Sequence, residues 1–189
     1  MLLPGKGHGT VLLLFSAIIS GYAAGEADAA LRFVNGMARY PLPFLPETDY
    51  TALAWIRPEN LAAPGIQQVF SAWCRASDDP LRITIEGGNA HARIESRDGF
   101  VGTAGLPLSE GEWTHLAAVK QGNRLTLYIN GEAASVTDAP EKVNSASLEA
   151  AFGANPRYSG GEHFHGCISD ALFLACALSA VEIEQRIAD

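Results

Sequence analysis

Charged residues are scarce in this chain of 189 residues, and basic residues are scarcer than acidic ones. Only 18% of the residues are charged, and 13 Lys and Arg stand against 21 Asp and Glu, which gives a formal net charge of −8. No segment gathers Lys or Arg into a cluster. Because nucleic-acid binding depends on clustered positive charge, this composition excludes nucleic acid as a partner.

Cysteine is also rare. The three cysteines stand at positions 74, 167 and 176, without Cys-x-x-Cys or zinc-like spacing. A continuous strand would place Cys167 and Cys176 about 30 Å apart, beyond disulfide reach. A disulfide would therefore join Cys74 to Cys167 or to Cys176. The alternative is that all three are small buried apolar residues, as free cysteines commonly are. The sequence leaves both open.

Familiar hydrolase motifs and membrane-spanning segments are absent as well. There is no Gly-x-Ser-x-Gly and no His-Glu-x-x-His. The longest apolar run, residues 11–19, is too short to span about 30 Å of hydrocarbon comfortably. It follows Lys6 and precedes a stretch of small residues, which is the pattern of a secretory signal peptide. We therefore expect residues 1–29 to be removed, leaving a mature chain of residues 30–189 that is secreted, extracellular or periplasmic, and not membrane-spanning.

The mature chain shows the alternation typical of β-strands. Residues 112–134 predict two strands joined by a tight turn, followed by a second turn at Asn130-Gly131, where positive φ is tolerated. Further strands are expected near residues 31–34, 38–40, 50–57, 67–75, 81–86, 90–95, 148–153 and 164–175. Only the tail predicts a helix, with Ser179 as N-cap and Glu182 at the capping-box position. This pattern indicates an all-β, two-sheet antiparallel jelly-roll sandwich with a short C-terminal helix.

Four segments carry a more specific pattern. They are Leu-Arg-Phe with Asn-Gly at 31–36, the aromatic strand ending in proline at 50–58, the hairpin at 112–131, and the closing strand and helix start at 164–179. In this order they resemble the laminin-G-like jelly roll of the concanavalin A-like superfamily, over nearly all of the mature chain. The resemblance implies framework positions for Trp55 and Trp113, and a fold whose members mostly bind ligands.

The resemblance also bears on calcium. Many relatives hold a structural calcium between the opening turn and two adjacent acidic residues of the closing strand. Here Asn35 lies in the opening turn, and only Asp170 is acidic in the closing strand, because Ser169 takes the first position. Calcium needs six to eight oxygen ligands. The implied site, Asn35 with Asp170, therefore has fewer carboxylates than the relatives, and no cofactor is required.

Trp73 and Arg75 are candidate ligand-binding residues. In a strand over residues 67–75 they share the face opposite Phe70. If Phe70 points into the core, Trp73 could stack on a sugar ring at the outer concave surface, where Arg75 could bind hydroxyls or a carboxylate. The alternative is that Trp73 simply packs over the sheet.

Two further groups are candidates. His163 and His165 flank Phe164 and would share one side of an extended chain, where they could bind a transition metal; a solvated pair is the alternative. Arg157 and Tyr158, in the loop at residues 155–162, could contribute to a ligand surface.

The sequence thus predicts a secreted, noncatalytic recognition module, and we favour carbohydrate as its ligand. The second hypothesis is a structural or adhesive module that binds an extracellular protein. The third is a polysaccharide-degrading enzyme. Sandwich glycosidases resembling this fold carry a Glu-x-Asp-x-x-Glu strand, which is absent here.

Overall fold

The predicted hairpin is present, and it anchors one of two sheets. In the computed structural model, which describes residues 30–188, β9 (Thr114–Gln121) pairs antiparallel with β10 (Arg124–Ile129). Asn130 and Gly131 then both adopt positive φ, 50° and 88°, and lead into β11 (Glu132–Asp138). Two consecutive positive φ values define the turn that best matches the twist of a hairpin. The predicted signal peptide, residues 1–29, lies outside the described residues.

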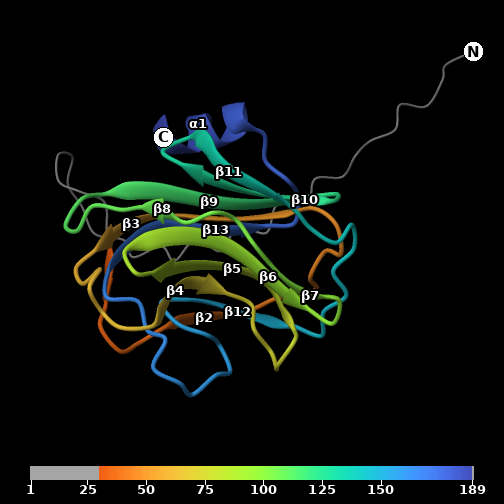
Figure 1. The fold of residues 1–189 in the computed structure, drawn as a ribbon, viewed down its shortest axis with the longest axis horizontal. Coiled ribbons are helices and arrows are strands. Elements are labelled where there is room, and N and C mark those ends of the chain that lie inside the picture. The colour runs from red at the N-terminus through yellow and green to blue at the C-terminus, as the bar shows by residue number, and fades with distance from the viewer. Residues whose placement is uncertain (1–29, 189) are drawn as a thin grey trace, which may run out of the picture.

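The strands form two antiparallel sheets packed face to face (Figure 1). The six-stranded sheet has the order β1-β13-β3-β9-β10-β11, and adds β1 (Leu31–Phe33), β13 (Gly166–Leu174) and β3 (Tyr50–Pro58) to the hairpin strands. The seven-stranded sheet has the order β2-β12-β4-β5-β6-β7, with β8 paired to β6. Its strands are β2 (Ala38–Pro41), β12 (Glu149–Phe152), β4 (Ile66–Ser71), β5 (Asp79–Glu86), β6 (Asn89–Ser96), β7 (Gly99–Gly102) and β8 (Leu106–Pro107).

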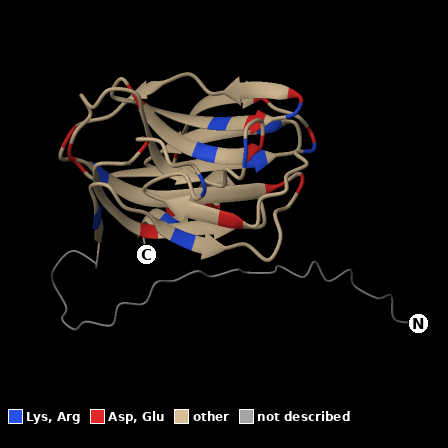
Figure 2. Cartoon of the chain, turned by 90° about the horizontal axis from the view of Figure 1, so that it is seen from below, with Lys and Arg blue, Asp and Glu red and all other residues tan. Residues whose placement is uncertain are grey.

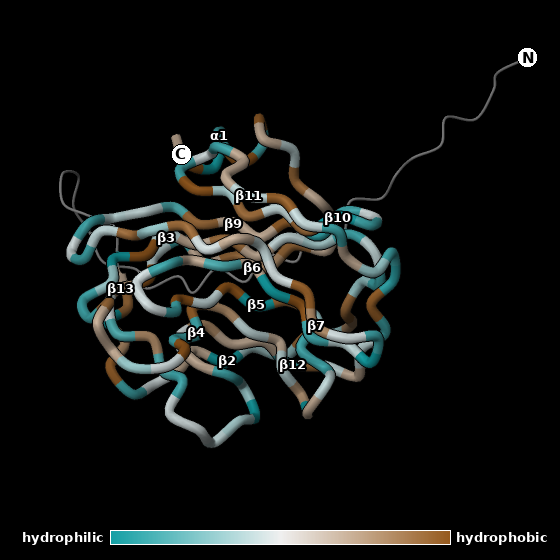
Figure 3. Tube along the Cα trace, in the orientation of Figure 1, coloured by the Kyte–Doolittle hydropathy of each residue, from teal (hydrophilic) through white to brown (hydrophobic). Residues whose placement is uncertain are grey.

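The main core lies between the sheets. Alternate residues of each strand point inward, and hydrophobic segments recur along the strands of both sheets (Figure 3). Phe70 stacks on Phe173 across the sandwich, with ring centroids 5.6 Å apart. The predicted two-sheet antiparallel sandwich is therefore confirmed. Among the described residues, no helix is long and apolar enough to cross a membrane.

Helix α1 (Ala180–Ala188) covers part of the outer face of the six-stranded sheet. Its capping box is as predicted: the Ser179 amide donates to Glu182 Oε2 at 2.8 Å, and the Glu182 amide donates to Ser179 Oγ at 3.3 Å. Ile183 is fully buried against Leu53 and Val119. The helix thus seals a second, smaller apolar cluster.

One predicted strand is too long. The strand expected over residues 67–75 ends at Ser71, because the next residues form a turn closed by hydrogen bonds between Arg75 and Asp78 and between Cys74 and Asp78. Asp79 fixes this point, since its carboxylate accepts from Ser71 Oγ at 3.0 Å and from the Ala72 amide at 3.2 Å. The prediction that Trp73 lies on the strand face opposite Phe70 therefore does not apply, because Trp73 is not in the strand. The strands β7, β8 and β11 were not predicted.

Candidate ligand-binding site

The connection between β4 and β5 positions Trp73. Its amide donates to Ser71 Oγ at 3.0 Å, and its side chain is half-buried. Two residues later, Arg75 lies in the turn with 67% of its side chain exposed and its Nε 3.4 Å from Asp78 Oδ2. Trp73 and Arg75 are thus held by a hydrogen-bonded turn rather than by a strand.

The loop that follows β12 carries Tyr158 and projects at the end of the molecule opposite α1 (Figure 1). Its base is fixed to β4. Glu162 Oε2 accepts from Gln68 Nε2 at 2.8 Å and from Asn155 Nδ2 at 2.7 Å, and the Gln68 amide donates to the Glu162 carbonyl at 3.1 Å. The loop is therefore anchored at both ends of its exposed part.

The two segments meet through their aromatic rings. Trp73 and Tyr158 pack edge to face, with centroids 5.6 Å apart and planes inclined by 62°. This geometry is favourable for an aromatic pair. Tyr158 is 45% exposed and Trp73 is half-buried, so part of the pair faces solvent. We call these two residues the aromatic pair.

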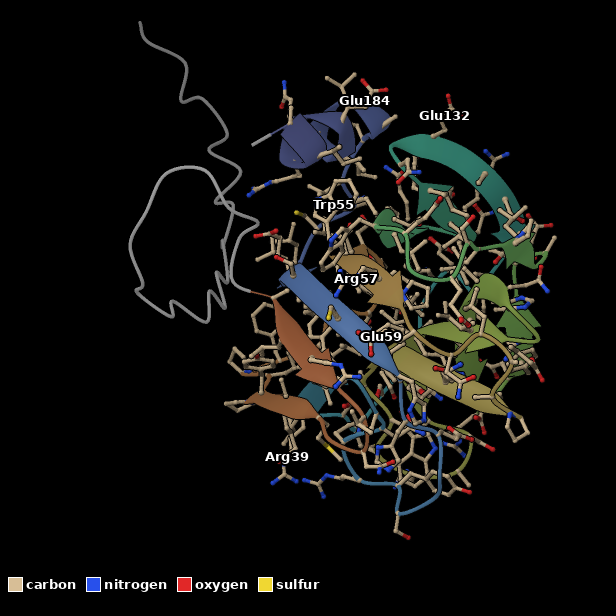
Figure 4. The ribbon with its side chains drawn as sticks, turned by 90° about the vertical axis from the view of Figure 1, so that its left-hand side faces the viewer. Arg39, Trp55, Arg57, Glu59, Glu132 and Glu184 are labelled. Atoms are coloured by element: carbon tan, nitrogen blue, oxygen red, sulfur yellow. The ribbon has the colours of Figure 1, made fainter. Side chains whose placement is uncertain are left out.

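An open depression of about 600 Å³ adjoins Tyr158. Arg157 Nε donates to Glu149 Oε2 at 2.9 Å within it. Arg39 of β2 also lines the depression, at the end of the molecule far from Glu184 of α1 (Figure 4). The lining residues are Arg39, Glu149, Pro156, Arg157, Tyr158 and Ser159. Four sequence-predicted residues, Trp73, Arg75, Arg157 and Tyr158, thus gather around two sequence-distant loops.

Arg39 and Glu149 were missed by sequence analysis. Neither belongs to a motif, and 110 positions separate them in the chain. They come together only because β2 pairs with β12, with Arg39 opposite Ala151 and Pro41 opposite Glu149. No local signal in the sequence indicates that pairing.

The histidine pair does not form a recognisable metal site. His163 makes a parallel bridge with Gln68, and its Nδ1 is buried without a hydrogen-bond partner in the described structure. The His165 amide donates to Gln67 Oε1 at 3.0 Å. Within residues 30–188, no group of three or more His, Cys, Asp or Glu side chains is arranged to hold a metal.

The structure does not bring Asn35 and Asp170 together. In the pairing of β1 with β13, Phe33 lies opposite Gly166 and Leu31 opposite Ile168. Asn35 and Asp170 therefore lie beyond opposite ends of this pairing. The Asp170 carboxylate also accepts from Ser169 Oγ at 2.8 Å. These two residues do not fit a shared calcium ion.

All three cysteines have free thiols, so no disulfide joins Cys74 to Cys167 or Cys176. Cys167 is buried, and the other two are half-buried. In the nearby turn, the ionised form of the Asp78 carboxylate is stabilised. Burial alone would raise the pKa of Asp78, but hydrogen bonds from Ser145 Oγ, the Ala146 amide and Cys74, together with the charge of Arg75, outweigh burial and lower it.

A pair of carboxylates in the seven-stranded sheet invites comparison with a glycosidase. Asp79 lies opposite Glu95 in the pairing of β5 with β6. Burial raises the pKa of Asp79 to about 7, but the side chain is completely inaccessible and is bound by Ser71 and Ala72. Glu95 accepts from the Ser77 amide and from Arg82. Asp79 thus stabilises the turn that holds Trp73 and does not face a cleft.

Comparison with known proteins assigns the chain to a family. Residues 33–184 match the family Laminin_G_3, described as the concanavalin A-like lectin/glucanases superfamily. No curated protein matches the sequence.

Several solved structures share the fold at low sequence identity. Domains LG4-5 of the mouse laminin alpha1 chain align with a TM-score of 0.62 and 15% identity, over 79% of this chain and 44% of that one. The binding domain of botulinum neurotoxin serotype D gives 0.66 and 13%, over 84% and 41%. The binding domain of botulinum neurotoxin DC in complex with SialylT gives 0.58 and 13%, over 75% and 35%. The chain spans less than half of each structure.

The expected resemblance is thus confirmed by sequence, over most of the chain, and by structure. The match at 33–184 covers all four segments that indicated it, apart from the first two residues of the opening strand. The protein is a member of the laminin-G-like family of the concanavalin A-like lectin/glucanase superfamily.

Proposed function

We propose that the protein is an exported, noncatalytic recognition module that binds carbohydrate at the aromatic pair and the adjoining depression. The observation that carries this proposal is the contact between Trp73 and Tyr158, which leaves both rings partly exposed beside Arg157. Export rests on the signal peptide predicted at residues 1–29.

The chemistry of the site suits a sugar. An aromatic ring offers a rigid apolar surface for the C–H face of a pyranose, at little cost in conformational entropy. Guanidinium groups around it supply several hydrogen-bond donors for hydroxyl or carboxylate oxygens. A shallow, open depression also admits a ligand longer than one residue of sugar. These features together favour an oligosaccharide over a small apolar molecule.

The similar structures support recognition as the class of function. The binding domain of botulinum neurotoxin DC was solved in complex with SialylT and, separately, in complex with rat synaptotagmin II. Those ligands belong to those proteins. Because sequence identity is 13% and 12%, the likeness supplies the fold, and the ligand of this chain rests on its own side chains.

A protein-binding function is the second candidate, and a different surface favours it. On the outer face of the six-stranded sheet, Trp55 and Arg57 of β3 are followed by Glu59, just after the strand (Figure 4). The Arg57 guanidinium lies 5.5 Å from the ring centroid of Trp113, which is 36% exposed. Tryptophan and arginine are enriched at the centres of protein interfaces. This surface would serve an adhesive module.

A glycan array distinguishes the two. We expect the wild-type protein to bind a subset of glycans, and Tyr158→Ala and Trp73→Ala to lose most of that binding because the stacking surface is removed. Trp113→Ala is the matched control, since it removes a partly exposed tryptophan that lies just before β9 of the other sheet.

Melting temperatures of all variants show whether the fold is retained. Tyr158→Ala is the safer variant, because its side chain is in an exposed loop. Unchanged glycan binding by both variants would exclude the aromatic pair. Loss of binding only in Trp113→Ala would move the site to the six-stranded sheet, and no glycan binding by the wild type would favour the adhesive function.

A further inference from the structure

Three arginines surround the aromatic pair, in a chain whose net charge is −8. Arg39 and Arg157 line the depression beside Tyr158, and Arg75 lies two residues after Trp73. They come from β2, from the loop after β12 and from the turn before β5. Acidic and basic residues are interspersed over the molecule as a whole (Figure 2). A local group of three arginines is therefore a departure from the overall composition.

The carboxylates next to these arginines are less accessible than the arginines themselves. The side chain of Arg75 is 67% exposed, against 6% for Asp78, and that of Arg157 is 54% exposed, against 26% for Glu149. Asp78 is also occupied by Ser145 Oγ at 2.5 Å and the Ala146 amide at 3.1 Å. The surface therefore presents the positive member of each pair to solvent.

Both ion pairs leave most of each guanidinium unused. Arg75 and Arg157 contact their carboxylates through Nε, at 3.4 and 2.9 Å. The two terminal nitrogens of each remain for another acceptor, and a guanidinium binds a carboxylate or sulfate best through such a pair of donors. Arg39 is exposed and has no ion-pair partner among the described residues.

The groups are close enough to act together. The rings of Trp73 and Tyr158 are in contact, so the segments that carry Arg75 and Arg157 lie side by side. Both arginines also act on Cys74: burial raises the pKa of its thiol to about 11, while the charges of Arg75 and Arg157 act in the opposite direction. Two positive charges are therefore carried by the segments that the aromatic pair joins.

We propose that the ligand of this surface is an acidic oligosaccharide, whose carboxylate or sulfate group is bound by Arg39, Arg75 and Arg157 while a sugar ring packs on Tyr158 and Trp73. This inference rests on the proposed function and specifies its ligand class. The carboxylates nearby do not oppose it strongly. Glu149 and Asp78 are paired, and one oxygen of Glu162 is taken by Gln68 and Asn155.

The test is titration calorimetry with three oligosaccharides of equal length: one sulfated, one carrying uronic acid without sulfate, and one neutral. We expect the wild type to bind at least one acidic probe and to bind the neutral probe at least tenfold more weakly, about the effect of one charged hydrogen-bonded pair. Arg39→Gln and Arg157→Gln should each weaken binding of the acidic probe by about tenfold. The sulfated and uronic acid probes distinguish the two sources of anionic charge.

Arg124→Gln is the matched control, because Arg124 is an exposed arginine of β10 in the other sheet. It should leave binding unchanged. If the neutral and acidic probes bind with equal affinity, and Arg39→Gln and Arg157→Gln leave that binding unchanged, the acidic ligand is overturned and the carbohydrate proposal stands. An equal loss in Arg124→Gln would reduce the effect to general charge and also overturn it. No binding of any probe by the wild type would overturn both proposals.

Discussion

Several residues that look chemically active in the sequence are structural in the fold. His115 is buried with its ring edge against Trp55, at 5.4 Å between centroids, and burial lowers its pKa to about 4. Asp79 is buried and binds Ser71 and Ala72, the two residues before Trp73. Conversely, Arg39 has no motif around it and contributes to the candidate site. At this scale, burial decides the role of a side chain, and burial depends on the tertiary structure.

These two buried groups predict an unusual pH dependence of stability. The folded pKa of His115, about 4, lies below its ordinary value of 6.5, so its contribution to stability increases with pH between those values. Burial also lowers the pKa of His91, which acts in the same direction. The folded pKa of Asp79, about 7, lies above its ordinary value of 3.8, so its contribution decreases as pH rises through that range.

The two effects oppose each other below about pH 6.5, and Asp79 alone acts above it. We therefore expect the free energy of unfolding to fall as pH increases from about 6.5 to about 8. Asp79→Asn should abolish that fall, whereas Asp98→Asn, in an exposed turn, should retain it. Urea unfolding at a series of pH values measures the slope. An identical slope in Asp79→Asn and wild type would contradict the assignment.

Among the elements, the loop after β12 determines whether the candidate site exists. Its base hydrogen-bonds to β4, and its tip places Tyr158 against Trp73. The sequence predicted the loop and its two candidate residues, but not their contact with the β4–β5 turn. It also extended β4 through Trp73, because the alternation of residues 67–75 continues past the point where Asp79 captures Ser71 and Ala72. Local pattern cannot reveal a capture that depends on tertiary packing.

Two neighbouring glycines in this loop provide a sharp test of the aromatic pair. A Cβ added at Gly160 would overlap the ring of Tyr158, whereas one added at Gly161 would meet no atom within 4 Å. Because Tyr158 is an exposed side chain, its ring should move rather than the backbone. We expect Gly160→Ala to weaken ligand binding by about tenfold, with little change in melting temperature. Gly161→Ala should bind as the wild type does, and equal binding by both variants would argue against a role for the ring position.

For the whole molecule, the sequence predicted the architecture well. Turn residues, period-two alternation and the capping box at Ser179 are local signals, so the two sheets and α1 were accessible without a structure. The order of the strands in each sheet was not predicted. Pairings such as β2 with β12 join distant parts of the chain, and these pairings bring Arg39 to Arg157 and Tyr158. The candidate site is therefore a property of topology more than of any segment.

Calcium dependence is the remaining prediction at this scale. The family resemblance implied a site shared by Asn35 and Asp170, but the register of β1 and β13 places them beyond opposite ends of the pairing. Asp170 acts electrostatically on His115 of β9, whereas the carbonyl of Gly36 approaches Gly153 at the end of β12. A ligand that binds only the folded state raises the melting temperature. We therefore expect the same melting temperature in excess chelator and in excess calcium. A rise with calcium that Asp170→Asn removes would show that this residue binds the ion with other partners than Asn35.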